Sequence, residues 1–441
     1  MASAPQGADA FFPSCAAVAA FLLPLLNDKK NFSCLFFEIF CRTLPINTKI
    51  AKTLKLNTMT IPAEFDEIRP YLPDELPQIF EELIADPEFR AVIGYAIKDI
   101  PFEHVAMAMR ASKDNLAFQK SIIYPFLQGV VKKLTSEFSL SYDNVDSLRK
   151  SLCISNHRDI IMDSAFLSIL LVDVIDNTVE IAIGDNLLIR PWIKKLVRVN
   201  RSFIVQRSAS IREMLASSKR LSSYIHHAIA ERQQPVWIAQ REGRAKDSND
   251  RTQEGLIKML SMYSGGDIID ALMELNIAPT SISYEFDPCD YLKAKEFQQK
   301  RDNPEHKKSP ADDLENMKVG MFGYKGGVHY HVADCINGEI DAIDRSLGKN
   351  EKTAAVARII DRHIHKNYKF WPVNYYFYEQ LTGDTRFADR YTAEDKTKLD
   401  AYLQDRIARI DLPNRDDEFC RTKILEMYAN PVKNYIVATE E

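Results

Sequence analysis

The chain has 441 residues, of which 46% are hydrophobic and 27% are charged, and its formal net charge is −5. This composition is typical of a globular protein and excludes collagen-like, disordered and disulfide-scaffold chains. The small negative charge gives no overall attraction to nucleic acid, so no nucleic-acid partner is expected and any anion site must be local. The seven cysteines are odd in number and show no paired spacing, which indicates free thiols in a reducing compartment.

The first 58 residues differ in composition from the rest of the chain. Residues 10–26 are uncharged and mostly apolar, but they contain Pro13 and Pro24 and are short for a membrane span. One interpretation is a weakly anchoring membrane segment. The other, which we favour, is that Met59 opens the functional chain and residues 1–58 are a non-native extension, because the sequence becomes acidic and amphipathic at that point.

Residues 77 to about 137 carry apolar side chains at helical spacing. Ile79, Leu83 and Ile84 belong to one such set, and a second set runs from Phe118 to Val131. This spacing predicts helices. We therefore expect a helical N-terminal region over residues 59–145 that packs on the following domain.

One short stretch combines a histidine with two carboxylates. Residues 155–163 read Ser-Asn-His-Arg-Asp-Ile-Ile-Met-Asp and precede an apolar run. The pattern predicts a loop that presents His157 at the start of a helix, with Asp159 or Asp163 near enough to fix the imidazole tautomer, as in a general base. The same pattern is also typical of a solvated histidine at a helix N-terminus, where aspartates answer the helix dipole.

Beyond residue 159 the sequence alternates between strand and helix patterns. The expected strands cover residues 179–183, 202–205, 235–240, 277–286 and 326–332, and the clearest helices cover 191–196 and 210–232. This alternation is typical of an α/β domain. We expect a mostly parallel sheet flanked by helices over residues 146–335, followed by a helical C-terminal region over residues 336–441.

Three further segments lie at or near the expected strands. They read Asn-Arg-Ser-Phe-Ile-Val-Gln-Arg at 200–207, Gln-Arg-Glu-Gly-Arg-Ala-Lys at 240–246 and Ala-Pro-Thr-Ser-Ile-Ser-Tyr-Glu at 278–285. In this order and at these separations, they and the segment containing His157 resemble the four signature blocks of the glycerolipid acyltransferases, which acylate glycerol-3-phosphate and lysophosphatidate. The resemblance covers less than half of the chain.

The resemblance implies that His157 is the general base and that an aspartate orients it. The family pattern places this aspartate after four intervening residues, where this chain has Met162. Asp163 follows one residue later and leads into the helix as the family's aspartate does, so we prefer Asp163 to Asp159 as the orienting carboxylate. The shift of one residue leaves the pairing open.

The resemblance also implies a set of substrate-binding residues. Arg207 matches the arginine that closes the second block, whereas Arg201 stands where that block usually has glycine, so Arg201 either adds a phosphate contact or faces solvent. Guanidinium groups match two phosphate oxygens at once, which makes arginine suited to this task.

The third and fourth blocks supply the remaining candidates. Gly243 would allow close backbone approach, Arg244 would bind phosphate, and Glu242 would hold the loop or the arginines in place. Pro279 opens a strand that resembles the fourth block of the glycerol-3-phosphate branch. That block would shape the channel for the acyl chain and the thioester.

The implied reaction is O-acyl transfer from acyl-CoA or an acyl carrier protein to glycerol-3-phosphate or lysophosphatidate, by direct attack and with neither metal nor cofactor. Contact with a membrane surface is also implied, so we expect a peripheral or weakly anchored protein on the cytoplasmic side of a membrane. Two alternatives stay open. One is an acyltransferase for another polar lipid, such as an amino-acid lipid, and the other is a non-catalytic lipid-binding or scaffold protein, which the displaced aspartate suggests.

Overall fold

A computed structural model describes residues 61–97, 100–207 and 210–440. The extension expected at residues 1–58 lies outside these ranges. The described chain forms two compact units, the first with residues 71–126 and 188–200, and the second with residues 61–70, 127–187 and 201–440. None of the helices in the described ranges has the length and apolar character needed to cross a bilayer.

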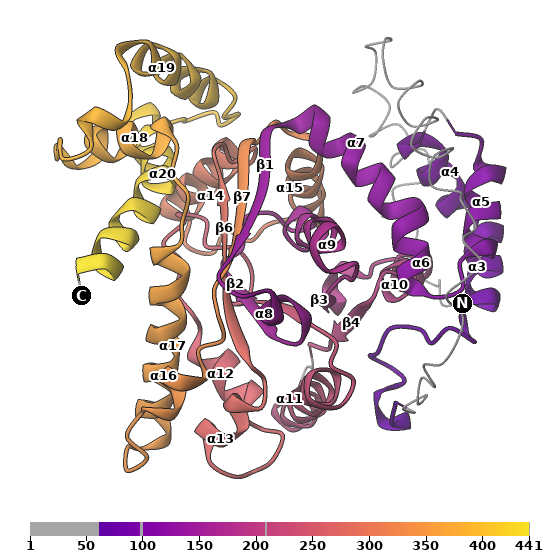
Figure 1. Cartoon of the computed structure of the whole chain (residues 1–441). Helices are drawn as coiled ribbons and strands as arrows, with labels where there is room; N and C mark the ends of the chain where they lie inside the picture. The colour runs from indigo at the N-terminus through magenta and orange to yellow at the C-terminus, as the bar shows by residue number, and fades with distance from the viewer. Residues whose placement is uncertain (1–60, 98–99, 208–209, 441) are drawn as a thin grey trace, which may run out of the picture. The chain divides into compact units, whose positions relative to one another are not determined.

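The first unit is helical. It contains α3 (Leu76–Ala85), α4 (Pro87–Ala96), α5 (Phe102–Ala111), α6 (Asn115–Phe118), the π-helix η3 (Gln119–Ile123) and α10 (Pro191–Val199) (Figure 1). Its core contains the buried side chains of Phe80, Leu83, Phe89 and Phe118. Asp86 fixes the start of α4, because its side chain accepts hydrogen bonds from the N–H groups of Glu88 and Phe89. The expectation of helices in the N-terminal region is confirmed, although the region does not stay helical as far as residue 145.

The second unit is built around a seven-stranded sheet. Its strands are β1 (Thr135–Tyr142), β2 (Leu152–Ser155), β3 (Glu180–Gly184), β4 (Ser202–Val205), β5 (Val236–Ala239), β6 (Ile277–Tyr284) and β7 (Gly326–Val332). Their order across the sheet is β1-β7-β6-β2-β5-β3-β4. In this described sheet β6 and β7 pair antiparallel, and every other neighbouring pair is parallel. The expected mostly parallel α/β sheet is confirmed.

Two strands are absent from the sequence prediction. Strand β2 has four residues, all of them buried, so it shows no alternation of polar and apolar side chains. Strand β1 follows directly on α7 (Tyr124–Leu134), with no loop to mark the change. The prediction of helix as far as about residue 137 is therefore wrong, because the chain enters the sheet at Thr135.

Helices cover both faces of this sheet. Between α7 and α17 (Lys349–Lys366), the second unit contains the α-helices α8 (Val145–Arg149), α9 (Met162–Ile175), α11 (Ile211–His226), α12 (Glu254–Leu260), α13 (Ile268–Met273), α14 (Asp290–Asp302), α15 (Pro310–Phe322) and α16 (Asn337–Asp341). Helix α9 and helix α17 lie on opposite sides of the strands (Figure 1). The side chains of β6 show the same division, because Ser281 bonds to the Ile364 carbonyl of α17 while Tyr284 contacts Phe166 of α9.

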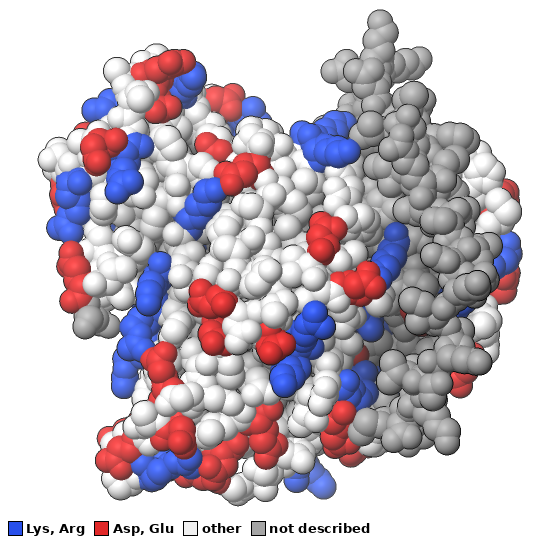
Figure 2. All heavy atoms as spheres, viewed as in Figure 1, with Lys and Arg blue, Asp and Glu red and all other residues white. Residues whose placement is uncertain are grey.

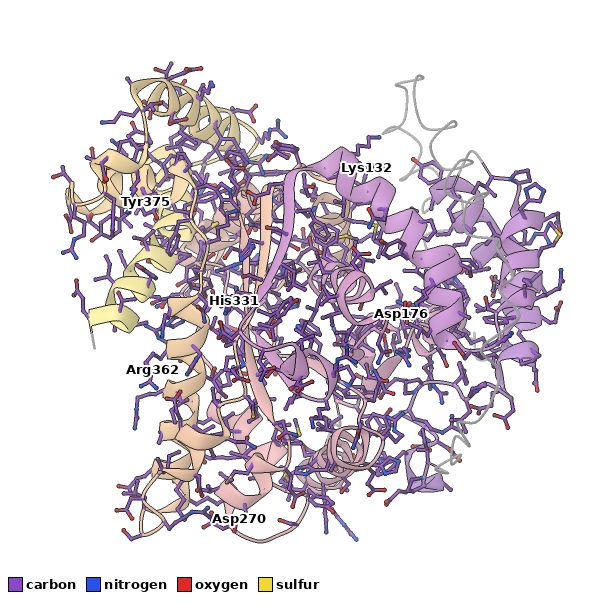
Figure 3. The ribbon with its side chains drawn as sticks, in the orientation of Figure 1. Lys132, Asp176, Asp270, His331, Arg362 and Tyr375 are labelled. Carbon is purple, nitrogen blue, oxygen red and sulfur yellow. The ribbon has the colours of Figure 1, made fainter. Side chains whose placement is uncertain are left out.

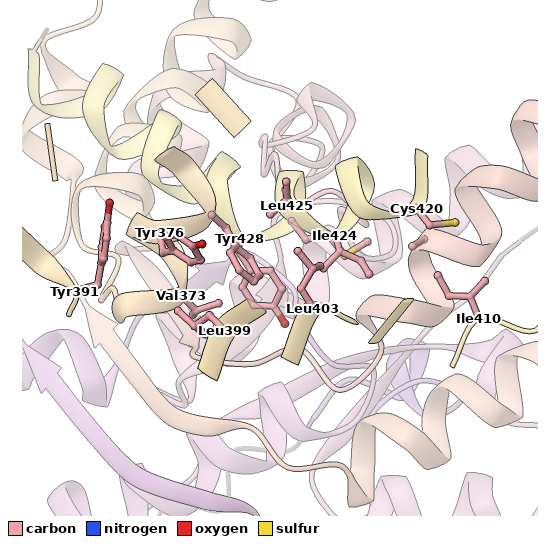
Figure 4. Close-up of a cluster of buried hydrophobic side chains, with 13 residues drawn as sticks. Val373, Tyr376, Tyr391, Leu399, Leu403, Ile410, Cys420, Ile424, Leu425 and Tyr428 are labelled. Atoms are coloured by element: carbon pink, nitrogen blue, oxygen red, sulfur yellow. The ribbon is translucent and has the colours of Figure 1, made fainter. Parts of the chain in front are cut away.

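The C-terminal helices share a core with α14. Helices α18 (Pro372–Thr382), α19 (Ala393–Ala408) and α20 (Asp417–Glu440) follow α17. Figure 4 shows the buried side chains that they bring together, among them Val373, Leu403, Ile424 and Tyr428. Asp290, at the start of α14, is fully buried and accepts hydrogen bonds from the Tyr402 and Tyr428 hydroxyls and from Arg406. A polar network thus ties α14 to α19 and α20.

Replacing Arg406 with Met should lower the free energy of unfolding by about 3–5 kcal/mol, because Asp290 would be left buried without its cation. Urea denaturation measures this change. Arg409→Met, on the same helix, is the control, because the pair of Arg409 with Asp405 is exposed and its loss should cost less than about 1 kcal/mol. Equal effects of the two substitutions would contradict a structural role for the buried pair.

Candidate functional site

The loop that follows β2 is held firmly between neighbouring strands. The Asn156 side chain donates to the Ile282 carbonyl at 2.9 Å and accepts from the Ile282 N–H at 2.8 Å, which fixes the loop to β6. On the other side, the Trp237 indole of β5 donates to the Ser155 hydroxyl at 3.0 Å. Both contacts are buried, so the next residue, His157, leaves the sheet from a defined position at the C-terminal end of β2.

His157 lies directly against a buried carboxylate. Its Nδ1 is 2.7 Å from Oδ2 of Asp163, and its side chain is 13% exposed whereas that of Asp163 is 0% exposed. The same Oδ2 accepts the backbone N–H groups of Arg158 and Asp159, and Oδ1 accepts the Tyr284 hydroxyl at 2.9 Å. An oxygen surrounded by donors acts as an acceptor, so Nδ1 carries a proton, and in the neutral form of the imidazole Nε2 has the lone pair.

Tyrosines from two strands complete the surroundings of Asp163. Burial raises the pKa of Tyr284 well above its usual value, and the nearby Asp163 carboxylate adds to this rise, so the hydroxyl stays a donor. The Tyr330 hydroxyl of β7 donates to the backbone carbonyl of Asp163 at 2.9 Å. Strands β6 and β7 therefore support the carboxylate that orients His157.

Asp159 has a different role from Asp163. Its Oδ1 accepts the N–H groups of Ile161 and Met162, each at 2.9 Å, and so caps the start of α9. A Cβ atom on Gly320 of α15 would come within 2.3 Å of the Asp159 carboxylate, which shows how closely α15 packs on this cap. Of the two candidate carboxylates, the structure brings Asp163 to the imidazole.

The ends of β4 and β5 contribute an arginine and a glutamate. Arg207 follows β4, and its Nη1 lies 2.9 Å from Oε1 of Glu242, which follows β5. The Arg207 N–H donates to Asp185, which follows β3. Because β2, β3, β4 and β5 run parallel, the ends of all four strands lie along the edge of the sheet where His157 is found.

Arg244 lies in a more buried position on the same loop. Its Nη2 donates to the Asn316 side chain of α15 at 3.3 Å. Burial by itself would lower the pKa of Arg244, but the neighbouring Cys289, Asp287 and Asp159 outweigh it and raise the pKa above its usual value. The preceding residue, Gly243, has a φ of +66° and no atom within 4 Å of a built Cβ, so it forms an open turn that favours glycine.

Two predicted substrate-binding residues are not brought to this edge. Arg201 precedes β4, so it lies at the opposite edge from His157, where it donates to the Asn177 side chain at 2.6 Å. Its φ of +60° lies in the left-handed region, which favours glycine, the residue usual at this position in the block that the segment resembles. Pro279 is buried within β6, beside Ile154 of β2, and shapes the interior of the sheet.

Sequence reasoning missed a polar network behind His157. The Arg158 guanidinium pairs with Asp250 at 2.8 Å, and the Tyr368 hydroxyl donates to the same carboxylate at 2.9 Å. The His365 Nε2–H of α17 donates to the Asp250 carbonyl at 3.0 Å. Arg158 and Tyr368 line a cavity of about 30 Å³, which is large enough for ordered water. The one sign of this network in the sequence was Arg158, which directly follows His157.

Two histidines of β7 have a structural role. His329 and His331 lie on β7, where His329 bonds to Ser139 and Ser141 and His331 bonds to Ser141 of β1. Figure 3 labels His331 on the strands of the sheet. Burial lowers the pKa of His329 to about 4, so it is neutral near pH 7. In the described ranges, no cluster of three or more His, Cys, Asp or Glu side chains is arranged to hold a metal.

Two comparisons with known proteins bear on this region of the chain. Residues 140–275 match the family model described as Acyltransferase. The match includes His157, Arg207 and the segment from Glu242 to Arg244. The search of curated proteins finds no match to the chain.

The stability of the network behind His157 should depend on pH through His365. Burial, reinforced by the Arg251 cation that faces Nδ1 at 3.3 Å, lowers the pKa of His365 from 6.5 to about 3. The unfolded chain therefore binds this proton first, and stability is lost as pH falls below about 6.5. Between pH 7 and pH 5 the wild type should lose about 2 kcal/mol more than His365→Gln. Urea denaturation at both values measures the difference, and parallel losses would contradict the assignment.

Proposed function

Residues 140–275 form an acyltransferase domain of the glycerolipid acyltransferase family, and from this premise we propose that the chain is an O-acyltransferase. It would move a fatty acyl group from acyl-CoA or an acyl carrier protein to a hydroxyl of glycerol-3-phosphate or lysophosphatidate. The observation that carries the proposal is the contact between His157 and Asp163, which leaves Nε2 of a partly exposed imidazole able to accept a proton.

The proposed reaction is a direct attack on the thioester. The acceptor hydroxyl gives its proton to Nε2 of His157 while its oxygen bonds to the thioester carbonyl carbon. Asp163 stabilises the imidazolium that forms. The tetrahedral intermediate then collapses, the carbon–sulfur bond breaks, and the leaving thiolate takes the proton from His157. The products are the acyl ester and the free thiol, and the imidazole is neutral again.

Arg207 and Arg244 are proposed to hold the acceptor phosphate. Both guanidinium groups lie on loops at the edge of the sheet that carries His157, and phosphate oxygens match the geometry of guanidinium N–H groups. Glu242 would orient Arg207 when the site is empty. Acidic and basic side chains alternate over the face seen in Figure 2, so a local cluster of arginines, and not the overall charge, would attract the anion.

The setting of the reaction belongs to the same proposal. An acyl product favours contact with a membrane surface, and we propose a peripheral protein on the cytoplasmic side. The direct contact of the displaced Asp163 with the imidazole supports turnover over a scaffold role, although a related acceptor such as an amino-acid lipid would use the same base. An acceptor panel with radiolabelled acyl-CoA separates these alternatives by the product formed.

Three substitutions test the base and its orienting carboxylate. His157→Ala should lower kcat at least about a thousandfold, and Asp163→Asn should lower it comparably, because an amide favours the wrong imidazole tautomer. Asp159→Asn is the matched control, since Asn caps helices about as well as Asp, and its kcat should stay within about tenfold of wild type. Initial rates of product formation measure all three. Equal losses for Asp159→Asn and Asp163→Asn would contradict the assignment.

A further inference from the structure

Arg241 stands out among the partly buried arginines. Its side chain is half-buried, its Nε is shielded from solvent, and that atom has no hydrogen-bond partner in the described chain. The buried or largely buried side chains of Arg158, Arg232 and Arg406 each hold a carboxylate. Removing a cation from water without a compensating contact costs free energy, so an unpaired guanidinium at such a position needs an explanation.

The neighbours of Arg241 place it at the candidate site. The preceding residue, Gln240, donates its N–H to the Ser155 carbonyl at 2.7 Å, two residues before His157. The following residue, Glu242, holds Arg207 at 2.9 Å. The backbone of Arg241 is therefore fixed between the end of the strand that carries His157 and the partner of a proposed phosphate-binding arginine.

Arg207, Arg241 and Arg244 differ in whether their guanidinium groups already have partners within the chain. Arg207 pairs with Glu242, and Arg244 donates to Asn316. Within the described ranges, Arg241 makes neither a hydrogen bond nor an ion pair with another side chain. The Nε–H of Arg241 is therefore a buried donor that a bound anion at this edge could satisfy.

We propose that Arg241 is a binding residue for the anionic group of the acceptor, and that a phosphate monoester is its ligand. This proposal rests on the acyl transfer proposed above and adds a third cation to it. A dianionic phosphate has oxygens enough for several guanidinium forks, whereas a neutral glycerol headgroup would leave Arg241 unpaired. Arg241 would thus determine the preference for phosphorylated over neutral acceptors and would leave proton transfer to His157 unaffected.

The test compares binding and turnover in Arg241 variants of the full chain. In Arg241→Gln, KM for glycerol-3-phosphate should rise roughly ten- to hundredfold, the loss expected for one charged hydrogen-bonded contact, while kcat at saturating acceptor changes little. Arg241→Lys keeps the charge without the fork and should fall between wild type and Arg241→Gln. Arg212→Gln is the control, because Arg212 is an exposed arginine on α11 and its removal should leave KM unchanged.

A binding measurement separates this proposal from the proposed reaction. Titration calorimetry of glycerol-3-phosphate into the protein without acyl donor should give a dissociation constant that rises in Arg241→Gln and stays unchanged in His157→Ala. Glycerol serves as the neutral probe, and its weaker binding should not respond to Arg241→Gln. If the wild type binds the phosphate but transfers no acyl group, the reaction is wrong while the Arg241 site stands. A KM and dissociation constant within twofold of wild type in a folded Arg241→Gln protein would overturn the site.

Discussion

The arrangement of the candidate site depends on one buried carboxylate. The Asp163 carboxylate accepts hydrogen bonds from the His157 imidazole, from two backbone N–H groups of the preceding loop and from the Tyr284 hydroxyl. A carboxylate that is shielded from water is stable only when such donors replace its hydration. The requirement acts in both directions, because the same bonds that stabilise the charge hold the loop, the helix start and the imidazole in one arrangement. Replacing any of these donors would therefore change the position of Nε2 of His157.

The parallel sheet explains why residues distant in sequence meet near this carboxylate. Strands β2, β4 and β5 end along one edge, and the residues that follow them include His157, Arg207 and Glu242. Strand β7 pairs antiparallel with β6, and the hydroxyl of its Tyr330 donates a hydrogen bond to the Asp163 carbonyl. The fold thus places chemistry on loops while rigid strands fix where each loop begins.

Much of the fold and part of the site follow from local patterns in the sequence. Strand β4 and the long helix α11 were expected from the strand and helix patterns of the sequence, whereas the preference for Asp163 over Asp159 came from the resemblance to the acyltransferase block. Arg201 shows where such reasoning stops. Its role depends on which side of a strand boundary it lies, and a side chain one residue before β4 is at the wrong edge of the sheet. Strand β2 was missed for a related reason, since a short strand buried on both faces has no periodicity to read.

The C-terminal helices place the last constraint on the site. Arg158, the neighbour of His157, is buried and needs a counter-ion, which Asp250 supplies. Asp250 is in turn held by His365 of α17 and by Tyr368, which follows α17. Thr252, two residues after Asp250, donates a hydrogen bond to Asp361 of α17. Because Asp250 lies six residues after Arg244, one set of contacts with α17 positions both the histidine loop and the arginine loop. The helical C-terminal region is therefore part of the structure that the proposed chemistry requires, and truncating it would expose Arg158 and release both loops together.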